Sequence, residues 1–138
     1  MSENSTELEG LQATLDKLVH HREKSKVKGL NLHAFIYFIT IRNLSGRSVT
    51  LKGRKWVLSN DDGTTTVVEG EKIVGETPVI PSGESFSYNS YHVTHLAATA
   101  SGSFHGVDEY EEKIHVRLSP FRLEIPEDLE KSEENPLS

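Results

Sequence analysis

The chain has 138 residues, of which 26% are charged, no cysteine and a formal net charge of −6. A chain of this length forms one domain with its own core, and the lack of cysteine excludes disulfide frameworks, zinc–thiolate sites and cysteine nucleophiles. No apolar run approaches the roughly 20 residues that span a bilayer, and the acidic start is unlike a signal peptide, so we expect a cytoplasmic protein without membrane contact.

The acidic charge lies at the two ends of the chain. Residues 1–10 carry −3 and residues 127–138 carry −4, whereas residues 11–126 balance at +1. Acidic segments that are poor in apolar residues stay solvated, so we predict a flexible N-terminus, one domain over residues 11–126 and a flexible C-terminal tail. The neutral body lacks the basic excess that nucleic-acid binding requires, so we expect no nucleic-acid partner.

Residues 8–21 fit two patterns. Four leucines are spaced three, four and three positions apart, as on one face of a helix: Leu8, Leu11, Leu15 and Leu18. Leu11, Ala13 and Leu15 also alternate with polar residues, as in a strand. Because a β-rich fold needs an opening strand here, we predict a strand.

Strand patterns fill the chain from Asn31 onward. Both alternating sets of residues 35–40 are largely apolar, which predicts a strand covered on both faces, or on one face with partial cover of the other. Ile114, Val116 and Leu118 alternate cleanly, and we expect Pro120 to break that strand before another at its C-terminal side.

Other short strands are separated by turn sequences. We predict them at residues 49–58, 64–68, 86–90 and 102–107, with turns such as Asn60-Asp61-Asp62-Gly63 and Pro81-Ser82-Gly83. Short strands with this punctuation predict an all-β fold, a sandwich of antiparallel strands.

A series of short motifs then follows in one order along residues 11–126. They are Phe35-x-Tyr37-x-Ile39-x-Ile41-x-Asn43, Arg54-x-Trp56, Val68-x-Gly70, Val74-Gly75-Glu76-x-Pro78, Pro81-x-Gly83-x-x-Phe86-x-Tyr88-x-Ser90, Gly102-x-Phe104-x-Gly106 and a segment from Pro120 to Pro126. In this order the motifs resemble the ApaG family. The resemblance implies an immunoglobulin- or fibronectin type III-like β-sandwich of about seven or more antiparallel strands.

The same resemblance carries implications for function. The family occurs alone in bacteria and as an appended domain of larger eukaryotic proteins, where it resembles a protein-interaction module, and no enzymatic activity is established for it. Its name derives from a cobalt and magnesium resistance phenotype, which implies an indirect role in divalent cation homeostasis as an alternative. Four positions depart from the family pattern. Lys72 replaces the middle glycine of Gly-x-Gly-x-x-Gly, Tyr91 stands where glycine is frequent, Lys55 stands where histidine is usual, and Ala100 stands where proline is frequent.

The loop at residues 70–75 is a candidate anion site. Gly70 and Gly75 flank Lys72, and Arg54 is a bidentate donor for phosphate or carboxylate, so a phosphate-containing small molecule is a possible ligand. A dinucleotide site is excluded because Lys72 and Pro78 break its pattern. The alternative, which we favour, is that both glycines hold turn conformations and Lys72 is solvated. Alternation on the strand places Lys52 and Arg54 on one face and Lys55 on the other.

Two aromatic residues are candidates for an interaction surface. Trp56 is either a core anchor, the interpretation we favour, or part of such a surface. Tyr91 is a candidate because alternation cannot place Tyr88, Tyr91 and Tyr110 all in the core, and exposed tyrosine is common at interfaces. A tyrosine that ties a corner of the sandwich is the alternative for one of the three.

Seven histidines raise the question of a metal site. His92 and His95 come closest to a metal motif, but no acidic partner lies at the right spacing, so we expect solvated histidines, no metal and no cofactor. No catalytic motif is present, so we expect no enzyme. The predicted function is a protein-interaction or adaptor domain, a monomer or homodimer with an unidentified protein partner; anion binding at residues 70–75 is an alternative.

Overall fold

The computed structural model describes residues 5–23 and 29–126, which form β-strands joined by turns. In chain order the strands are β1 (Thr6–Glu7), β2 (Leu11–Glu23), β3 (Leu32–Asn43), β4 (Val49–Asn60), β5 (Thr65–Glu71), β6 (Val79–Ile80), β7 (Ser85–Thr94), β8 (Ala98–Asp108) and β9 (Lys113–Leu123). Within these described residues no helix is long and apolar enough to cross a membrane.

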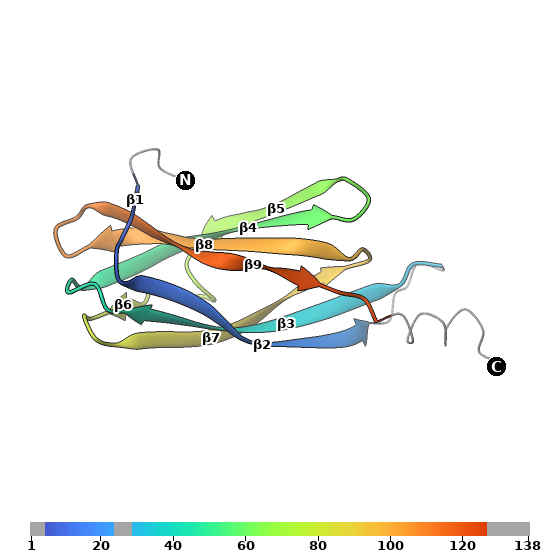
Figure 1. Ribbon diagram of the computed structural model, residues 1–138, viewed down its shortest axis with the longest axis horizontal. Helices are drawn as coiled ribbons and strands as arrows, with labels where there is room; N and C mark the ends of the chain where they lie inside the picture. Colours follow the sequence, from blue (N-terminus) through green and yellow to red (C-terminus); the bar gives the residue numbers. More distant parts are fainter. Residues whose placement is uncertain (1–4, 24–28, 127–138) are drawn as a thin grey trace.

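The strands form two sheets that pack face to face (Figure 1). The large sheet has the strand order β1-β9-β8-β4-β5, with β6 beside β4, and the small sheet has the order β2-β3-β7. The described pairings are antiparallel, apart from that of β1 with β9. The predicted all-β sandwich is confirmed, whereas the finer likeness to immunoglobulin or fibronectin domains stays a prediction.

One alternating set of β3 side chains points into the core between the two sheets. This set, which includes Phe35, Tyr37 and Ile39, is almost fully buried, whereas Ile36 and Phe38 on the opposite face are half-buried. The second predicted alternative, one covered face and one partly covered face, is therefore the correct one. The outward apolar residues of β3 are left over once the core is complete.

Trp56 on β4 lies at the centre of the core. Its side chain is 1% exposed, and its ring meets those of Tyr37 at 4.8 Å, His92 at 4.9 Å, Phe121 at 6.0 Å and Phe104 at 6.3 Å between centroids. Tilted and edge-on aromatic contacts of this kind add to the stabilisation from burial. Trp56 is thus the core anchor that we favoured, and its side chain does not contribute to a surface.

The opening segment is a strand, as predicted, and a bulge explains its helix-like leucine spacing. Strand β2 pairs with β3, and the register shifts between Leu15 and Lys17. One extra residue lets both Leu15 and Leu18 pack against the core, although they are three positions apart. The leucine spacing alone could therefore not distinguish a helix from a strand, because the bulge is not visible in the sequence.

Pro120 does not break β9, contrary to our prediction. The strand runs from Lys113 to Leu123, and Ala100 pairs with Phe121 while Gly102 pairs with Leu118, so β9 holds one extra residue here. A bulge tolerates proline because the ladder hydrogen bond is already interrupted there. The predicted strand after Pro120 is therefore the continuation of β9.

The N-terminal segment contains a strand that the sequence did not predict. Within the acidic residues 1–10, Thr6 pairs with Ile114 and Glu7 pairs with His115 in parallel. This pairing covers the outer edge of β9, whose backbone groups would otherwise face solvent. Residues 1–4 and the predicted C-terminal tail, 127–138, lie outside the described residues.

Candidate functional site

The loop after β5 combines left-handed backbone with internal hydrogen bonds. Lys72, Val74 and Gly75 have φ of 67°, 45° and 86°, so the middle-glycine position that Lys72 occupies is one that glycine suits better. The N–H of Lys72 donates to the Lys52 carbonyl at 2.7 Å, and Ile73 and Glu76 exchange N–H···O bonds at 2.7 and 3.1 Å. Three of the loop's N–H groups are therefore occupied, and the adjacent N–H groups of Val74 and Gly75 have no backbone partner among the described residues.

Arg54 stabilises this loop through its carbonyl groups. Its Nη1 donates to the carbonyl oxygens of Glu71 at 2.8 Å and Lys72 at 2.9 Å. A Cβ on Gly70 would lie 2.9 Å from the same Nη1. Gly70 is thus a strand residue that leaves room for the guanidinium; only Gly75 has the positive φ expected of a turn glycine, and our prediction for Gly70 is wrong.

A small hollow lies beside Arg54, between the two sheets. It has a volume of about 170 Å³ and is lined by Arg54, Lys72, Tyr37 and Tyr88, among others. The Tyr88 hydroxyl is buried without a hydrogen-bond partner among the described residues, and burial raises its pKa. Anion binding at this loop stays a prediction, and an anion there would compete with the two carbonyls for Nη1 of Arg54.

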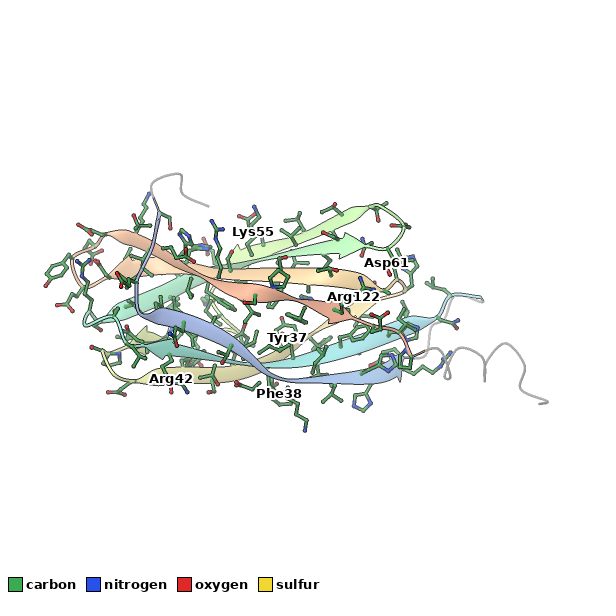
Figure 2. The ribbon with its side chains drawn as sticks, in the orientation of Figure 1. Tyr37, Phe38, Arg42, Lys55, Asp61 and Arg122 are labelled. Carbon is green, nitrogen blue, oxygen red and sulfur yellow. The ribbon has the colours of Figure 1, made fainter. Side chains whose placement is uncertain are left out.

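The basic side chains of β4 do not converge. A bulge between Leu51 and Gly53 shifts the alternation, so Lys52 lines an outer hollow with His105, whereas Arg54 faces the interior beside Tyr37. Our placement of Lys52 and Arg54 on one face is therefore wrong. Figure 2 shows Lys55 on the outer side of the large sheet and Tyr37 between the sheets.

Tyr91 lies in a row of apolar residues on the outer face of the small sheet. Register places Val19, Ile36 and Tyr91 side by side across β2, β3 and β7. Tyr91 is 62% exposed and Val93 is 47% exposed. We call this surface the Tyr91 patch, and its members are Val19, Ile36, Phe38, Tyr91 and Val93.

Polar rows close the Tyr91 patch on one side. The Lys17 ammonium lies 5.7 Å from the centre of the Phe38 ring, and the Thr40 hydroxyl bonds to that of Ser87 at 2.8 Å in the next row. Figure 2 shows Phe38 and Arg42 on this outer side, away from the core. The apolar area therefore ends in polar residues on this side.

The two remaining tyrosines have different surroundings. Tyr88 points inward and packs edge-on against Phe104, whereas Tyr110 is exposed with the Arg47 guanidinium 5.4 Å above its ring. Tyr91 has neither kind of cover, because no aromatic or cation–π contact involves it among the described residues. Of the three tyrosines it is the exposed one with neither face of its ring covered by such a contact.

The histidine pair proposed from spacing does not form a site. His92 is buried against Tyr37 and Trp56, and burial lowers its pKa to about 4, whereas His95 is exposed. No group of three or more metal-ligating side chains occurs in residues 5–23 and 29–126. The expectation of solvated histidines is wrong for three of the seven, since His33, His92 and His115 are buried.

Comparison with known proteins identifies the family. The model of the ApaG domain matches residues 23–111. The chain belongs to the ApaG domain family. Protein ApaG of Vibrio cholerae is 39% identical over 93 residues, which are 67% of this chain and 74% of that protein. Protein ApaG of Klebsiella pneumoniae is 42% identical over 94 residues, 68% of this chain and 70% of that one.

Solved structures show the same fold. An X-ray structure from the Northeast Structural Genomics Consortium matches with a TM-score of 0.75 at 27% identity, over 87% of this chain and 90% of that one. The crystal structure of the putative ApaA protein from Bordetella pertussis matches with a TM-score of 0.69 at 21% identity, over 89% and 98% of the two chains. Both solved structures therefore have the same fold as this chain.

Sequence reasoning singled out Tyr91 but missed its neighbours. The sequence did not predict a surface formed by Val19, Ile36 and Phe38, although residues 35–40 are largely apolar in both alternating sets. Apolar residues at both alternating sets of positions were the signal in the sequence for this surface. A strand with one face in solvent needs apolar residues in only one of its two sets. Only the pairing of β2, β3 and β7 shows that these residues lie side by side, because they come from three separate segments.

Proposed function

We propose that this ApaG-domain protein is a non-enzymatic interaction domain that binds a partner protein through the Tyr91 patch. The observation that supports it is the row of Val19, Ile36 and Tyr91, which leaves a large aromatic side chain exposed among apolar neighbours. Aromatic anchors inside a polar rim carry most of the binding energy at protein interfaces. The proposed partner presents an apolar surface that fits over the three strands.

The end of the apolar rows at polar residues supports a different protein as the partner over a second copy of this chain. Obligate homodimers bury large, core-like surfaces, whereas transient complexes use smaller patches with polar rims. Here the apolar rows end at Lys17 and Phe38, and the rows at Thr40 and Arg42 are polar. We therefore propose a reversible complex with an unrelated protein.

Two buried polar groups of this domain, Asp108 and Asn43, hold the backbone of turns, so neither is assigned a catalytic role in the proposal. The Asp108 carboxylate accepts the N–H groups of Tyr110 at 2.9 Å and Glu112 at 3.0 Å and pairs with Arg47 at 2.9 Å. The buried Asn43 amide bonds to backbone carbonyls of two neighbouring segments. Carboxylates and amides held in this way stabilise turns.

The proposal is tested by capturing partners with matched surface variants. Tyr91→Arg places a charge in the patch, and Val67→Arg does the same at a 53% exposed valine on β5 of the large sheet. We expect chemical cross-linking in cells to recover the same proteins with the wild type and Val67→Arg and to lose them with Tyr91→Arg. Equal recovery with Tyr91→Arg would contradict the proposal.

Sedimentation of the purified protein tests the choice of partner. The proposal expects a monomer at every concentration for the wild type and both variants. A concentration-dependent dimer that Tyr91→Arg abolishes would assign the patch to a second copy and overturn the proposed complex with another protein.

A further inference from the structure

We propose a second binding site, for a phosphate monoester, on the outer face of the large sheet. Register places Lys55 on β4, Ser103 on β8 and Arg117 on β9 in one row across three strands. Two cations thus flank a hydroxyl group on one sheet surface, which is the donor arrangement that a phosphate group accepts. The site lies on the opposite side of the sandwich from the Tyr91 patch and does not depend on it.

A hollow separates the two cations. Its volume is about 580 Å³, and its lining includes Lys55, Ser101, Ser103 and Arg117. The hollow exists because the middle strand, β8, contributes short serine side chains while its neighbours carry long ones. Small-molecule sites commonly have volumes of about 300–1,000 Å³, so the hollow holds a phosphate with a sugar-sized group attached.

Neither cation is neutralised within the described part of the chain. Lys55 and Arg117 take part in none of its ion pairs, in contrast to Arg47, which pairs with Asp108 at 2.9 Å, and Arg122, which pairs with Asp61 at 2.9 Å. Two unpaired cations around one hollow are notable in a chain with net charge −6. The two cations place positive charge beside the hydroxyl groups of Ser101 and Ser103 in the hollow.

His115 adds a donor at the edge of the hollow. It is 6% exposed and lines the hollow, and its Nδ1 lies 2.6 Å from the Ser5 hydroxyl. When that hydroxyl donates to Nδ1, Nε2 carries the ring proton, and Nε2 is buried with no hydrogen-bond partner among the described residues. Because Nε2 is shielded from the open hollow, a phosphate oxygen accepts from this N–H group only once the His115 ring turns toward the hollow.

Glu7 limits which anions fit. It pairs with His115 across β1 and β9 and also lines the hollow. Its carboxylate repels additional phosphates but accepts hydrogen bonds from hydroxyl groups, so a sugar monophosphate fits better than a polyphosphate. Glu69 neighbours Lys55 on the β5 side and does not line the hollow.

The test is an NMR titration of the full chain with inorganic phosphate, a hexose phosphate and the free hexose. We expect both phosphates to shift the amide signals of residues 101–103 and 115–118, the hexose phosphate to bind more tightly, and the free hexose to shift nothing. Shifts confined to residues 70–75, or no shift at millimolar phosphate, would overturn the proposal.

Matched double variants separate a built site from general attraction to basic residues. Lys55→Gln/Arg117→Gln removes both proposed ligands, and Lys52→Gln/Lys113→Gln removes the same charge at a neighbouring hollow. We expect at least about tenfold weaker binding for the first pair and less than about twofold for the second, because charge-assisted hydrogen bonds are lost only in the first. Equal weakening by the two pairs would show non-specific attraction and overturn the site.

Discussion

The two outer faces of the sandwich differ in chemistry although they flank one core. On the small sheet the outward residues Ile36 and Phe38 of β3 are apolar and support the Tyr91 patch. On the large sheet the outward residues of β8 include two serines, and Ser103 lies between Lys55 and Arg117. The core is complete without either set, because the inward residues alone bury Trp56. Residues that folding does not require therefore indicate what each face binds.

Burial supports the same contrast. Along β8 every second residue from Ala98 to Asp108 is buried, and the residues between them are small or polar. Along β3 the outward residues Ile36 and Phe38 are large and apolar. A solvated sheet face normally carries polar residues, so β8 follows the rule and β3 departs from it.

The largest expected effect concerns the core that both faces share. Trp56→Ala removes the central ring and should destabilise the domain by about 3–5 kcal/mol, since little around it can collapse into the space. Urea unfolding measures the loss, and Val67→Ala on the surface, expected to change stability by less than about 0.5 kcal/mol, is the control. A loss as small as that of the control would contradict the central role of Trp56.

Acid should destabilise the whole domain through protonation of His92, which lies in the core that the two faces share. Burial lowers its pKa from 6.5 to about 4. Because the folded pKa lies below the unfolded one, the stabilisation is fully present above pH 6.5, and about 3 kcal/mol is lost as the pH falls to about 4.

The contribution of His92 can be separated from that of the carboxylates. His92→Phe should make the stability profile less steep between about pH 6.5 and pH 4, while His20 and His105, whose pKa values burial also lowers, keep part of the slope. The pKa values of Asp61 and Asp62 are lowered from 3.8 by their hydrogen bonds, to Arg122 and to Thr64 respectively, so their stabilisation is lost only at lower pH. A profile unchanged by His92→Phe would contradict the assignment.

A smaller loss of stability is expected from a change at the loop after β5, which lies outside both outer faces. Gly70→Ala pushes against Nη1 of Arg54 and should cost about 1–2 kcal/mol as its bonds to the carbonyls of Glu71 and Lys72 weaken. In an Arg54→Met background the same change should cost less, which thermal unfolding of the four proteins measures. Additive losses would show that Gly70 serves another purpose.

The smallest expected effect is the most informative about the Tyr91 patch. Tyr91→Ser should change the free energy of unfolding by less than about 0.5 kcal/mol, because the exposed ring makes no aromatic or cation–π contact among the described residues. Urea unfolding checks this value. A loss above about 2 kcal/mol would make Tyr91 a folding residue and remove the reason to call its face a binding surface.

The sequence predicted the sandwich well, and three of its errors or ambiguities occur where bulges interrupt alternation. One bulge makes Leu15 and Leu18 resemble a helix, another accommodates Pro120 within β9, and a third separates Lys52 from Arg54. A bulge depends on the pairing of two strands, so one segment alone does not reveal it.

The candidate sites were harder to predict than the fold. Tyr91 was found because a tyrosine left over from the core is visible in the sequence, but its neighbours come from three strands. Lys55 and Arg117 are 62 positions apart in the sequence and meet only through β8. Contacts of this kind follow from sheet order, which local patterns do not specify.

The most direct test of the central claim is photo-cross-linking in living cells from positions 91 and 67. A photoreactive phenylalanine analogue replaces Tyr91 in one strain and Val67 in the other, which compares exposed positions on the two outer faces. We predict a discrete cross-linked product, the chain joined to a different protein, from position 91 and none from position 67. The same products from both positions, or a product only from position 67, would contradict the account.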